Sequence, residues 1–217
     1  MTSAIPICGV MVVDDHGIVR EGLIAMLRRQ VGVQVLGSAT SGQDAIRAAQ
    51  RLNPAIIIMD LVLPDMSGIE ATERILALLP QARVIMLSGC HTIEHVYRAL
   101  RAGALGYVVK DAPADELMQA VQAVREGRQY LSPQVAPPAV GGSNCYSLSK
   151  SPLERLSNRE RDVLSRIVAG ASSAAIGQHL SLSSKTIDTY RGRLMAKLGV
   201  SNRSALIRFV IENEFTR

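Results

Sequence analysis

The stretch AIIIMDLVLPDMSG, residues 55–68, leads a run of apolar residues directly into a carboxylate, Asp60. The run is short and rich in branched side chains, which is typical of a fully buried strand. A glycine at position 68 then opens a segment of helical periodicity that ends before Pro80. A charge at the end of a buried strand belongs where the strand leaves the core, so the stretch predicts a strand–loop–helix unit with a polar site at its junction.

Five units of this kind follow one another along the first part of the chain. Continuous apolar strands that alternate with helices are typical of a parallel sheet covered on both faces. We therefore expect an α/β fold, a doubly wound five-stranded parallel sheet, over residues 1–126. The predicted strands are residues 9–13, 33–36, 55–59, 83–87 and 106–109, and the predicted helices are residues 16–30, 41–52, 68–79, 92–102 and 113–125.

The pattern changes after residue 126. Residues 127–152 are rich in proline, glycine and small polar residues, which is the composition of a flexible linker. Residues 153–217 show helical periodicity only, and we expect a second, smaller all-α domain there. Residues 1–131 hold 12 Lys and Arg against 13 Asp and Glu, whereas residues 132–217 hold 12 against 6, a net charge of +6. A neutral half joined to a basic half predicts that the second half meets a polyanion.

Composition disfavours several other classes of protein. No apolar run approaches the ~18–20 residues that a membrane span needs, and the first residues resemble no signal peptide, so we expect a cytoplasmic chain without membrane contact. Cys8, Cys90 and Cys145 lie far apart and outside any metal-binding spacing, which favours reduced structural thiols, with a redox sensor as the alternative. His91 and His95 lack a third ligand and are interpreted as surface residues.

Polar residues follow four of the predicted strands at the same end. Asp14 and Asp15 follow the first strand, Asp60 the third, Ser88 the fourth and Lys110 the fifth. Ligands in such folds bind beyond the carboxyl ends of the strands. Three close carboxylates repel one another unless a cation intervenes, and Mg²⁺ accepts one or two carboxylates together with a phosphate. These residues predict a Mg²⁺ site in which Asp60 is a nucleophile that forms an acyl phosphate, with Ser88 and Lys110 facing the phosphoryl group.

Each of these residues also has an ordinary interpretation. Asp14 or Asp15 alone could cap the helix that follows, Lys110 alone could be a surface lysine, and Ser88 alone could be a loop hydroxyl. His16, beside the acidic pair, is interpreted as a partly exposed neighbour of the site and not as a ligand. The combination at one end of the correct strands favours a site.

With these residues in place, residues 9–126 resemble the receiver domain of bacterial two-component response regulators, which is a flavodoxin-like fold. The resemblance rests on the set above together with Pro64 and Gly68, four and eight residues after Asp60. It implies that Asp60 accepts phosphate from a sensor histidine kinase, and that Tyr107 rotates when Ser88 moves toward the phosphate. The Mg²⁺ ligands that it implies are Asp14 (mostly through water), Asp15, Asp60 and the backbone carbonyl of Val62.

Four short helices are predicted in the basic half, and the third of them, residues 185–198, is the most informative. Ile187, Leu194 and Leu198 give it an inward face, while short polar residues between cationic flanks cover the opposite face. Such a face suits the major groove, where the flanks hold phosphates and the middle meets base edges. A tight turn before this helix completes a helix-turn-helix. The alternative is a solvated bundle whose basic excess serves only solubility.

The stretch TIDTYRGRLMAKLGVSNRSALI, residues 186–207, resembles the LuxR-type DNA-binding domain, and the match spans about residues 153–214. The full chain then resembles a NarL/FixJ-type response regulator. The resemblance implies a helix-turn-helix over residues 172–191 and a fourth helix that pairs subunits into a homodimer on double-stranded DNA. Base contacts are implied for Asp188, Thr189 and Gly192, and contacts to the DNA backbone or within the fold for Lys185, Thr186, Tyr190, Arg193 and Lys197. Many relatives carry lysines at positions 188 and 192, so we expect a different target sequence here.

The favoured hypothesis is a transcription regulator in which phosphorylation of Asp60 promotes dimers and releases the recognition helix. The alternative is a constitutive DNA-binding regulator whose receiver works without phosphorylation. A third hypothesis, an aspartyl-phosphate hydrolase, is disfavoured because Val62 stands where such enzymes usually need a second acid. Beyond self-catalysed transfer to Asp60 and slow autodephosphorylation, we expect no enzymatic activity.

Overall fold

The structure is a computed structural model, and it describes residues 7–89, 92–135 and 152–212. The predictions made for Cys90, His91, Cys145 and residues 136–151 lie outside these residues. The described chain divides into two compact units, an α/β unit followed by a helical unit. Among the described residues, no helix combines the length and the apolar character that crossing a membrane requires.

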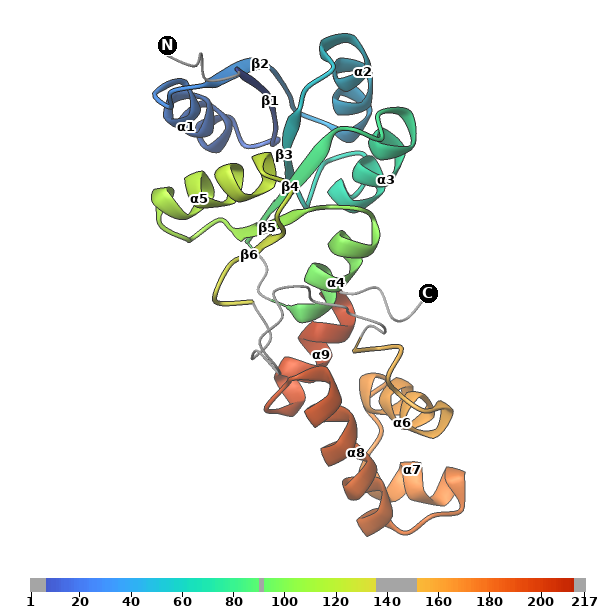
Figure 1. Cartoon of the computed structure of the whole chain (residues 1–217). Helices are drawn as coiled ribbons and strands as arrows, with labels where there is room; N and C mark the ends of the chain where they lie inside the picture. The colour runs from blue at the N-terminus through green and yellow to red at the C-terminus, as the bar shows by residue number, and fades with distance from the viewer. Residues whose placement is uncertain (1–6, 90–91, 136–151, 213–217) are drawn as a thin grey trace. The chain divides into compact units, whose positions relative to one another are not determined.

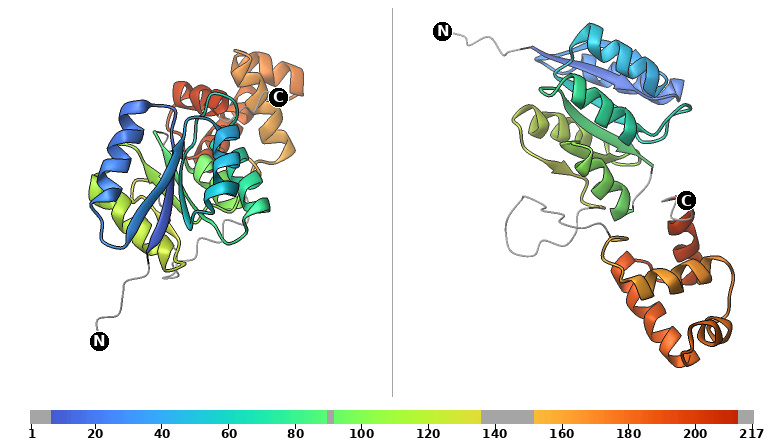
Figure 2. Two further views of the ribbon diagram at one scale, coloured as in Figure 1. Left: turned by 90° about the horizontal axis from the view of Figure 1, so that it is seen from above. Right: turned by 90° about the vertical axis from the view of Figure 1, so that its right-hand side faces the viewer.

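The α/β unit holds a parallel sheet whose strand order, over the described residues, is β2-β1-β3-β4-β5-β6. Helices α1 and α5 cover one face of the sheet, and α2, α3 and α4 cover the other (Figures 1 and 2). The strands are β1 Cys8–Val13, β2 Val33–Ala39, β3 Ile56–Asp60, β4 Arg83–Ser88, β5 Gly106–Val109 and β6 Tyr130–Leu131. The helices are α1 Gly17–Arg28, α2 Gly42–Leu52, α3 Gly68–Leu78, α4 Ile93–Arg101 and α5 Ala114–Arg125.

Alternating side chains along the strands explain why the sheet is covered twice. Val10 and Val12 of β1 pack in the core beneath α1 and α5, whereas Met11 and Val13 pack in the core beneath α2, α3 and α4. Every residue of β3, including Asp60, is buried. The predicted α/β class and doubly wound parallel sheet are therefore confirmed.

The sheet has one strand more than the five expected. β6 pairs in parallel with Gly106 and Tyr107 of β5, and Val135 is still part of the core. The sheet thus extends past residue 126, into the segment whose composition indicates a linker. A strand of two residues is too short to show periodicity in the sequence. The neighbouring Gly127 and Pro133 make the local composition resemble that of a linker.

Two single residues were interpreted from sequence spacing alone. Cys8 is a buried free thiol, and burial raises its pKa above 9.0 although Arg125 and Arg83 act against this, which agrees with a structural role. His95, expected on the surface, is instead buried, and its Nδ1 shares a hydrogen bond of 2.7 Å with the Thr92 hydroxyl. Spacing along a helix does not by itself tell which face is covered.

The helical unit consists, over the described residues, of α6 Asn158–Val168, α7 Ser173–Leu180, α8 Ser184–Leu198 and α9 Arg203–Glu212. Helix α6 begins with the expected capping box, in which Ser157 and Glu160 accept each other's backbone N–H groups. All four helices contribute to one apolar core. The turn between α7 and α8 packs so closely that a Cβ at Gly177 would lie 2.5 Å from the Leu182 carbonyl oxygen.

Candidate functional site

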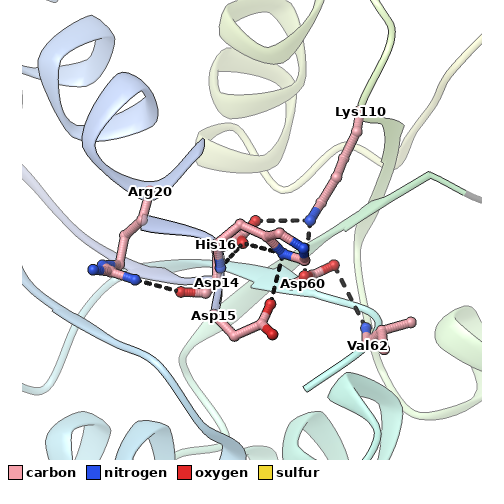
Figure 3. A network of polar contacts seen from close by, with 7 residues as sticks. All are labelled: Asp14, Asp15, His16, Arg20, Asp60, Val62 and Lys110. Carbon is pink, nitrogen blue, oxygen red and sulfur yellow. Dashed lines mark hydrogen bonds and ion pairs between the residues drawn. The ribbon is translucent and has the colours of Figure 1, made fainter. Parts of the chain in front are cut away.

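The structure brings Asp14, Asp60 and Lys110 together where β1, β3 and β5 end (Figure 3). Lys110 Nζ donates a hydrogen bond of 2.8 Å to Asp60 Oδ2 and lies 2.9 Å from Asp14 Oδ2. Both carboxylates are buried, and only 23% of the lysine side chain is exposed. One ammonium group therefore faces two buried carboxylates, which leaves the cluster with an excess of negative charge.

The loop from β1 to α1 carries the rest of the acidic set. Asp14 Oδ1 accepts the His16 N–H at 2.8 Å, and the Asp14 carbonyl accepts a hydrogen bond of 2.9 Å from Arg20 Nη1. Asp15 is exposed, and its Oδ1 lies 2.7 Å from His16 Nδ1. These contacts place His16 beside the site, with most of its side chain in solvent.

Ser88 and Tyr107 are both buried on the strands between Asp60 and the sheet edge. Ser88 ends β4, and its carbonyl accepts the Lys110 N–H at 2.7 Å, so that the two residues are neighbours across the strands. Tyr107 lies on β5 before the strand ends, and its side chain packs in the core beneath α2, α3 and α4. Val62 is exposed, with its N–H 3.5 Å from Asp60 Oδ1. The residues expected to bind a phosphoryl group thus come together at one rim of the sheet.

The loop between β3 and α3 is held at both ends. The Gly68 N–H donates to the Leu61 carbonyl at 2.8 Å, and a Cβ at Gly68 would lie 1.9 Å from the Asp60 carbonyl oxygen, so the loop accepts only glycine there. Asp65 accepts the N–H groups of Gln43 and Gly42, at 2.9 and 2.8 Å, at the start of α2. These bonds lower the pKa of Asp65 below 3.8. Sequence reasoning missed Asp65, because no local pattern relates this loop to a helix that precedes it.

Burial and ion pairing oppose each other at the centre of the site. Burial raises the pKa of Asp60 above 3.8, and the hydrogen bond and charge of Lys110 offset this only in part. Burial alone lowers the pKa of Lys110, but its close contacts with Asp60 and Asp14 and the charges of both carboxylates outweigh it, so this pKa lies above 10.5. Lys110 is therefore charged at neutral pH.

The acidic cluster fits a divalent cation. Asp14, Asp15, His16 and Asp60 each offer a ligand atom, and these atoms all lie within 4.8 Å of one another. Asp14 Oδ2 is buried and makes no hydrogen bond, although the Lys110 ammonium is close enough for an ion pair. Carboxylate oxygens are the ligands that Mg²⁺ prefers, so the donor set agrees with the cation expected from the sequence.

The outer face of α8 carries most of the residues expected to meet DNA. Six of the expected residues are exposed: Lys185, Asp188, Thr189, Gly192, Arg193 and Lys197. Thr186 and Tyr190 are half-buried and line a shallow depression together with Ser183, Lys185, Thr189 and Arg193. This face can therefore present polar groups to a groove and cations to phosphates.

Lys197 is exposed, but its ammonium group is bound to partners within the helical unit. Its Nζ donates to Glu160 Oε2 at 2.7 Å and to the Arg155 carbonyl at 3.2 Å. Glu160 is buried, and burial alone raises its pKa, but the bonds from Lys197 and Ser157 lower it below 4.5. Of the two roles expected for Lys197, this geometry supports the contact within the fold.

Asp188 is also engaged in a contact that sequence reasoning missed. The Ser173 hydroxyl donates a hydrogen bond of 2.8 Å to Asp188 Oδ1, and Arg191 Nη2 lies 3.1 Å from the same oxygen. Spacing by three residues on a helix could have indicated the partner Arg191. No sequence signal indicated Ser173, which comes from the preceding helix.

Each of the two units matches the model of a known protein family. Residues 10–122 match the model of the response regulator receiver domain, and residues 154–210 match that of the bacterial regulatory proteins of the luxR family. Response regulator GacA of Pseudomonas viridiflava is 38% identical over 193 residues, which are 89% of this chain and 90% of GacA.

Two solved structures of RcsB are similar over nearly the full chain. RcsB from Salmonella enterica serovar Typhimurium, bound to promoter P1flhDC in the presence of phosphomimetic BeF3-, shares 26% identity at a TM-score of 0.71, covering 94% of this chain and 97% of RcsB. A structure of two RcsB dimers bound to two parallel DNAs shares 26% identity at a TM-score of 0.78, covering 94% and 98%.

Proposed function

The chain belongs to the LuxR/NarL family of response regulators, as a DNA-binding member of a two-component system, and from this premise we propose that a phosphoryl group on Asp60 controls its binding to DNA. The observation that carries the proposal is the buried Asp60 carboxylate, held by Lys110 Nζ at 2.8 Å where β3 ends. A phosphoryl group on this buried carboxylate would add negative charge next to a single cation, so the site needs further positive charge when the group is bound. The proposed phosphodonor is the phosphohistidine of a sensor histidine kinase.

Asp60 is the nucleophile in this proposal. One of its carboxylate oxygens attacks the phosphorus of the donor, the bond from phosphorus to the leaving group breaks, and an acyl phosphate forms on Asp60. Lys110 forms an ion pair with the Asp60 carboxylate before transfer. After transfer, its ammonium group pairs with the negatively charged phosphoryl oxygens. Ser88, at the end of the neighbouring β4, supplies a hydroxyl donor to the same group.

Mg²⁺ is the proposed cofactor, with Asp14, Asp15, Asp60 and the Val62 carbonyl as its ligands, Asp14 mostly through water. Bound there, Mg²⁺ supplies positive charge that offsets the carboxylates and the transferred group. The buried Asp14 Oδ2 without a hydrogen bond supports this assignment. Arg20 keeps the Asp14 backbone in place from α1 and thereby presents the carboxylate to the site.

In the helical unit, we assign recognition of double-stranded DNA to α8. Thr189 and Gly192 face the bases, and Lys185, Thr186, Tyr190 and Arg193 serve the DNA backbone or the turn of the motif. Because RcsB is solved as dimers on DNA, we extend the proposal to a homodimer on DNA that pairs through α9. We propose that the Asp60 phosphate favours this dimer and releases α8, and that no chemistry beyond transfer to Asp60 and slow autodephosphorylation takes place.

The test is to map a phosphoryl adduct on the full chain. The protein is incubated with acetyl phosphate and Mg²⁺, digested, and analysed by mass spectrometry beside Asp60→Asn and the control Asp44→Asn, whose native side chain is 49% exposed. We expect an alkali-labile adduct on Asp60 in the wild type and in Asp44→Asn, and its loss in Asp60→Asn or when a chelator removes Mg²⁺. An adduct that maps elsewhere, or that survives Asp60→Asn, would refute the proposal.

A further inference from the structure

Asp188 lies on the exposed face of α8, where a carboxylate could accept a hydrogen bond from a cytosine amino group. The structure shows it in a contact of three side chains from two helices. Its Oδ1 accepts the Ser173 hydroxyl at 2.8 Å and lies 3.1 Å from Arg191 Nη2, and Arg191 Nη1 donates to Ser173 Oγ at 3.4 Å. Ser173 is the first residue of α7, so the contact joins the two helices of the motif.

This geometry leaves Asp188 poorly suited to base contacts. A residue that recognises a base must direct its acceptor at the base edge, whereas the contacts of Oδ1 with Ser173 and Arg191 fix the orientation of the Asp188 carboxylate toward the protein. Arg191 also compensates the carboxylate charge, which otherwise would repel phosphates. An exposed ion pair alone contributes little, about 0–1 kcal/mol, but the third partner on a separate helix restricts the arginine to one orientation.

The same contact fixes the orientation of the Arg191 side chain. Its side chain stays 43% exposed, and its guanidinium lies against Ser173 at the start of α7. A helix N-terminus and an arginine both attract phosphate, and phosphate contacts of this kind fix the register of a protein on DNA. Arg191 belongs to the cationic flanks that the sequence already led us to expect at phosphates, and the contact with Asp188 and Ser173 is what the structure adds.

We infer that Asp188 is a positioning residue that holds Arg191 against Ser173, and that Arg191 meets a DNA phosphate while Asp188 contacts no base. The inference deepens the proposed DNA-binding function and rests on it. It assigns the base contacts of α8 to Thr189 and to the backbone at Gly192, and none to Asp188.

The first test is a selection of binding sites. The full chain, treated with acetyl phosphate and Mg²⁺, selects duplexes from a random-sequence library as the wild type and as Asp188→Asn. Asparagine keeps the shape and the acceptor for Ser173 and Arg191, but as a base reader it prefers adenine, where aspartate accepts from cytosine. We expect both proteins to select the same sequence. A change from cytosine to adenine at one position in Asp188→Asn would overturn the inference.

The second test measures the coupling between the two residues on the duplex that the wild type selects. Arg191→Gln is expected to weaken all duplexes alike and to reduce the dependence of log Kd on log salt by about 0.9 per lost phosphate contact. Asp188→Ala and Arg191→Gln together are expected to depart from additivity by about two- to five-fold. Equal effects of Asp188→Ala with and without Arg191 would overturn the inference. Circular dichroism checks that each variant is folded, and a wild type that selects no duplex would refute the DNA-binding function itself.

Discussion

Single side chains set the chemistry of the phosphoryl site. Lys110 faces both Asp60 and Asp14 at less than 3 Å, and these carboxylates are buried. Without the ammonium, two buried negative charges would repel each other and any incoming phosphoryl group. In the proposed function, Lys110 therefore has two tasks, to keep Asp60 ionised and to receive the charge of the phosphoryl oxygens.

We predict that Lys110→Ala slows formation of the Asp60 adduct by about 10²–10³-fold, because it removes a preorganised charge from the reacting group. The rate is measured with acetyl phosphate and Mg²⁺ by intact-protein mass spectrometry. Arg51→Ala, which removes an exposed cation from α2 of the same unit, is the matched control and should react at the wild-type rate. A Lys110→Ala variant that is folded and reacts as fast as the control would contradict this role.

Contacts made by loops and helix ends keep residues beside the functional sites in position. Asp65 joins the loop after Asp60 to the first two residues of α2, and Gly68 closes the same loop against β3. In the helical unit, Glu160 joins the start of α6 to Lys197 near the end of α8. These contacts set the position of an element relative to its neighbours within each unit.

For the loop, we predict that Asp65→Ala increases hydrogen exchange at residues 61–67 and at the first turn of α2, because two N–H groups lose their acceptor. Misplacing the loop beside Asp60 should also slow adduct formation, by up to about a hundred-fold. Arg51→Ala, in the last turn of α2 and away from this contact, should do neither. Unchanged exchange in Asp65→Ala would show that the loop is held by other means.

For the helical unit, we predict a pH-dependent contribution of Glu160. Its pKa is lower in the folded chain than its ordinary value of 4.5, so its contribution is complete above that value and is lost as the pH falls through the folded pKa. Hydrogen exchange in α6 and α8 should show Glu160→Gln to be less stable than the wild type by roughly 1 kcal/mol at neutral pH, with the difference shrinking in acid. A difference that does not change with pH would contradict the assignment.

The sequence was sufficient for the elements and the chemical groups of the site, but not for contacts between distant segments. Apolar strands with helices between them predicted the sheet, and Asp14, Asp60 and Lys110 do meet at its rim. β6 was missed because two residues carry no periodicity. Asp65 and the partners of Asp188 were missed because these hydrogen bonds cross between elements, and only the packed fold brings the two sides together.

In the proposed function, the full chain couples a phosphoryl site in one unit to a DNA-binding helix in the other. A phosphoryl group shifts such an equilibrium only by the difference in its affinity for the two states of the chain. A change of one hundred-fold in DNA affinity would require about 2.7 kcal/mol of such a difference. The new ion pair with Lys110 and the hydrogen bond with Ser88 are the interactions that we propose as its source.

The most direct test is the affinity of the full chain for its selected duplex, measured by fluorescence anisotropy with and without acetyl phosphate and Mg²⁺. We predict that the phosphodonor lowers the Kd of the wild type by at least about ten-fold, which is about 1.4 kcal/mol, and leaves the Kd of Asp60→Asn unchanged. Equal Kd values for the phosphorylated and unphosphorylated wild type, with the adduct on Asp60 verified in the same sample, would contradict control of DNA binding by this aspartate.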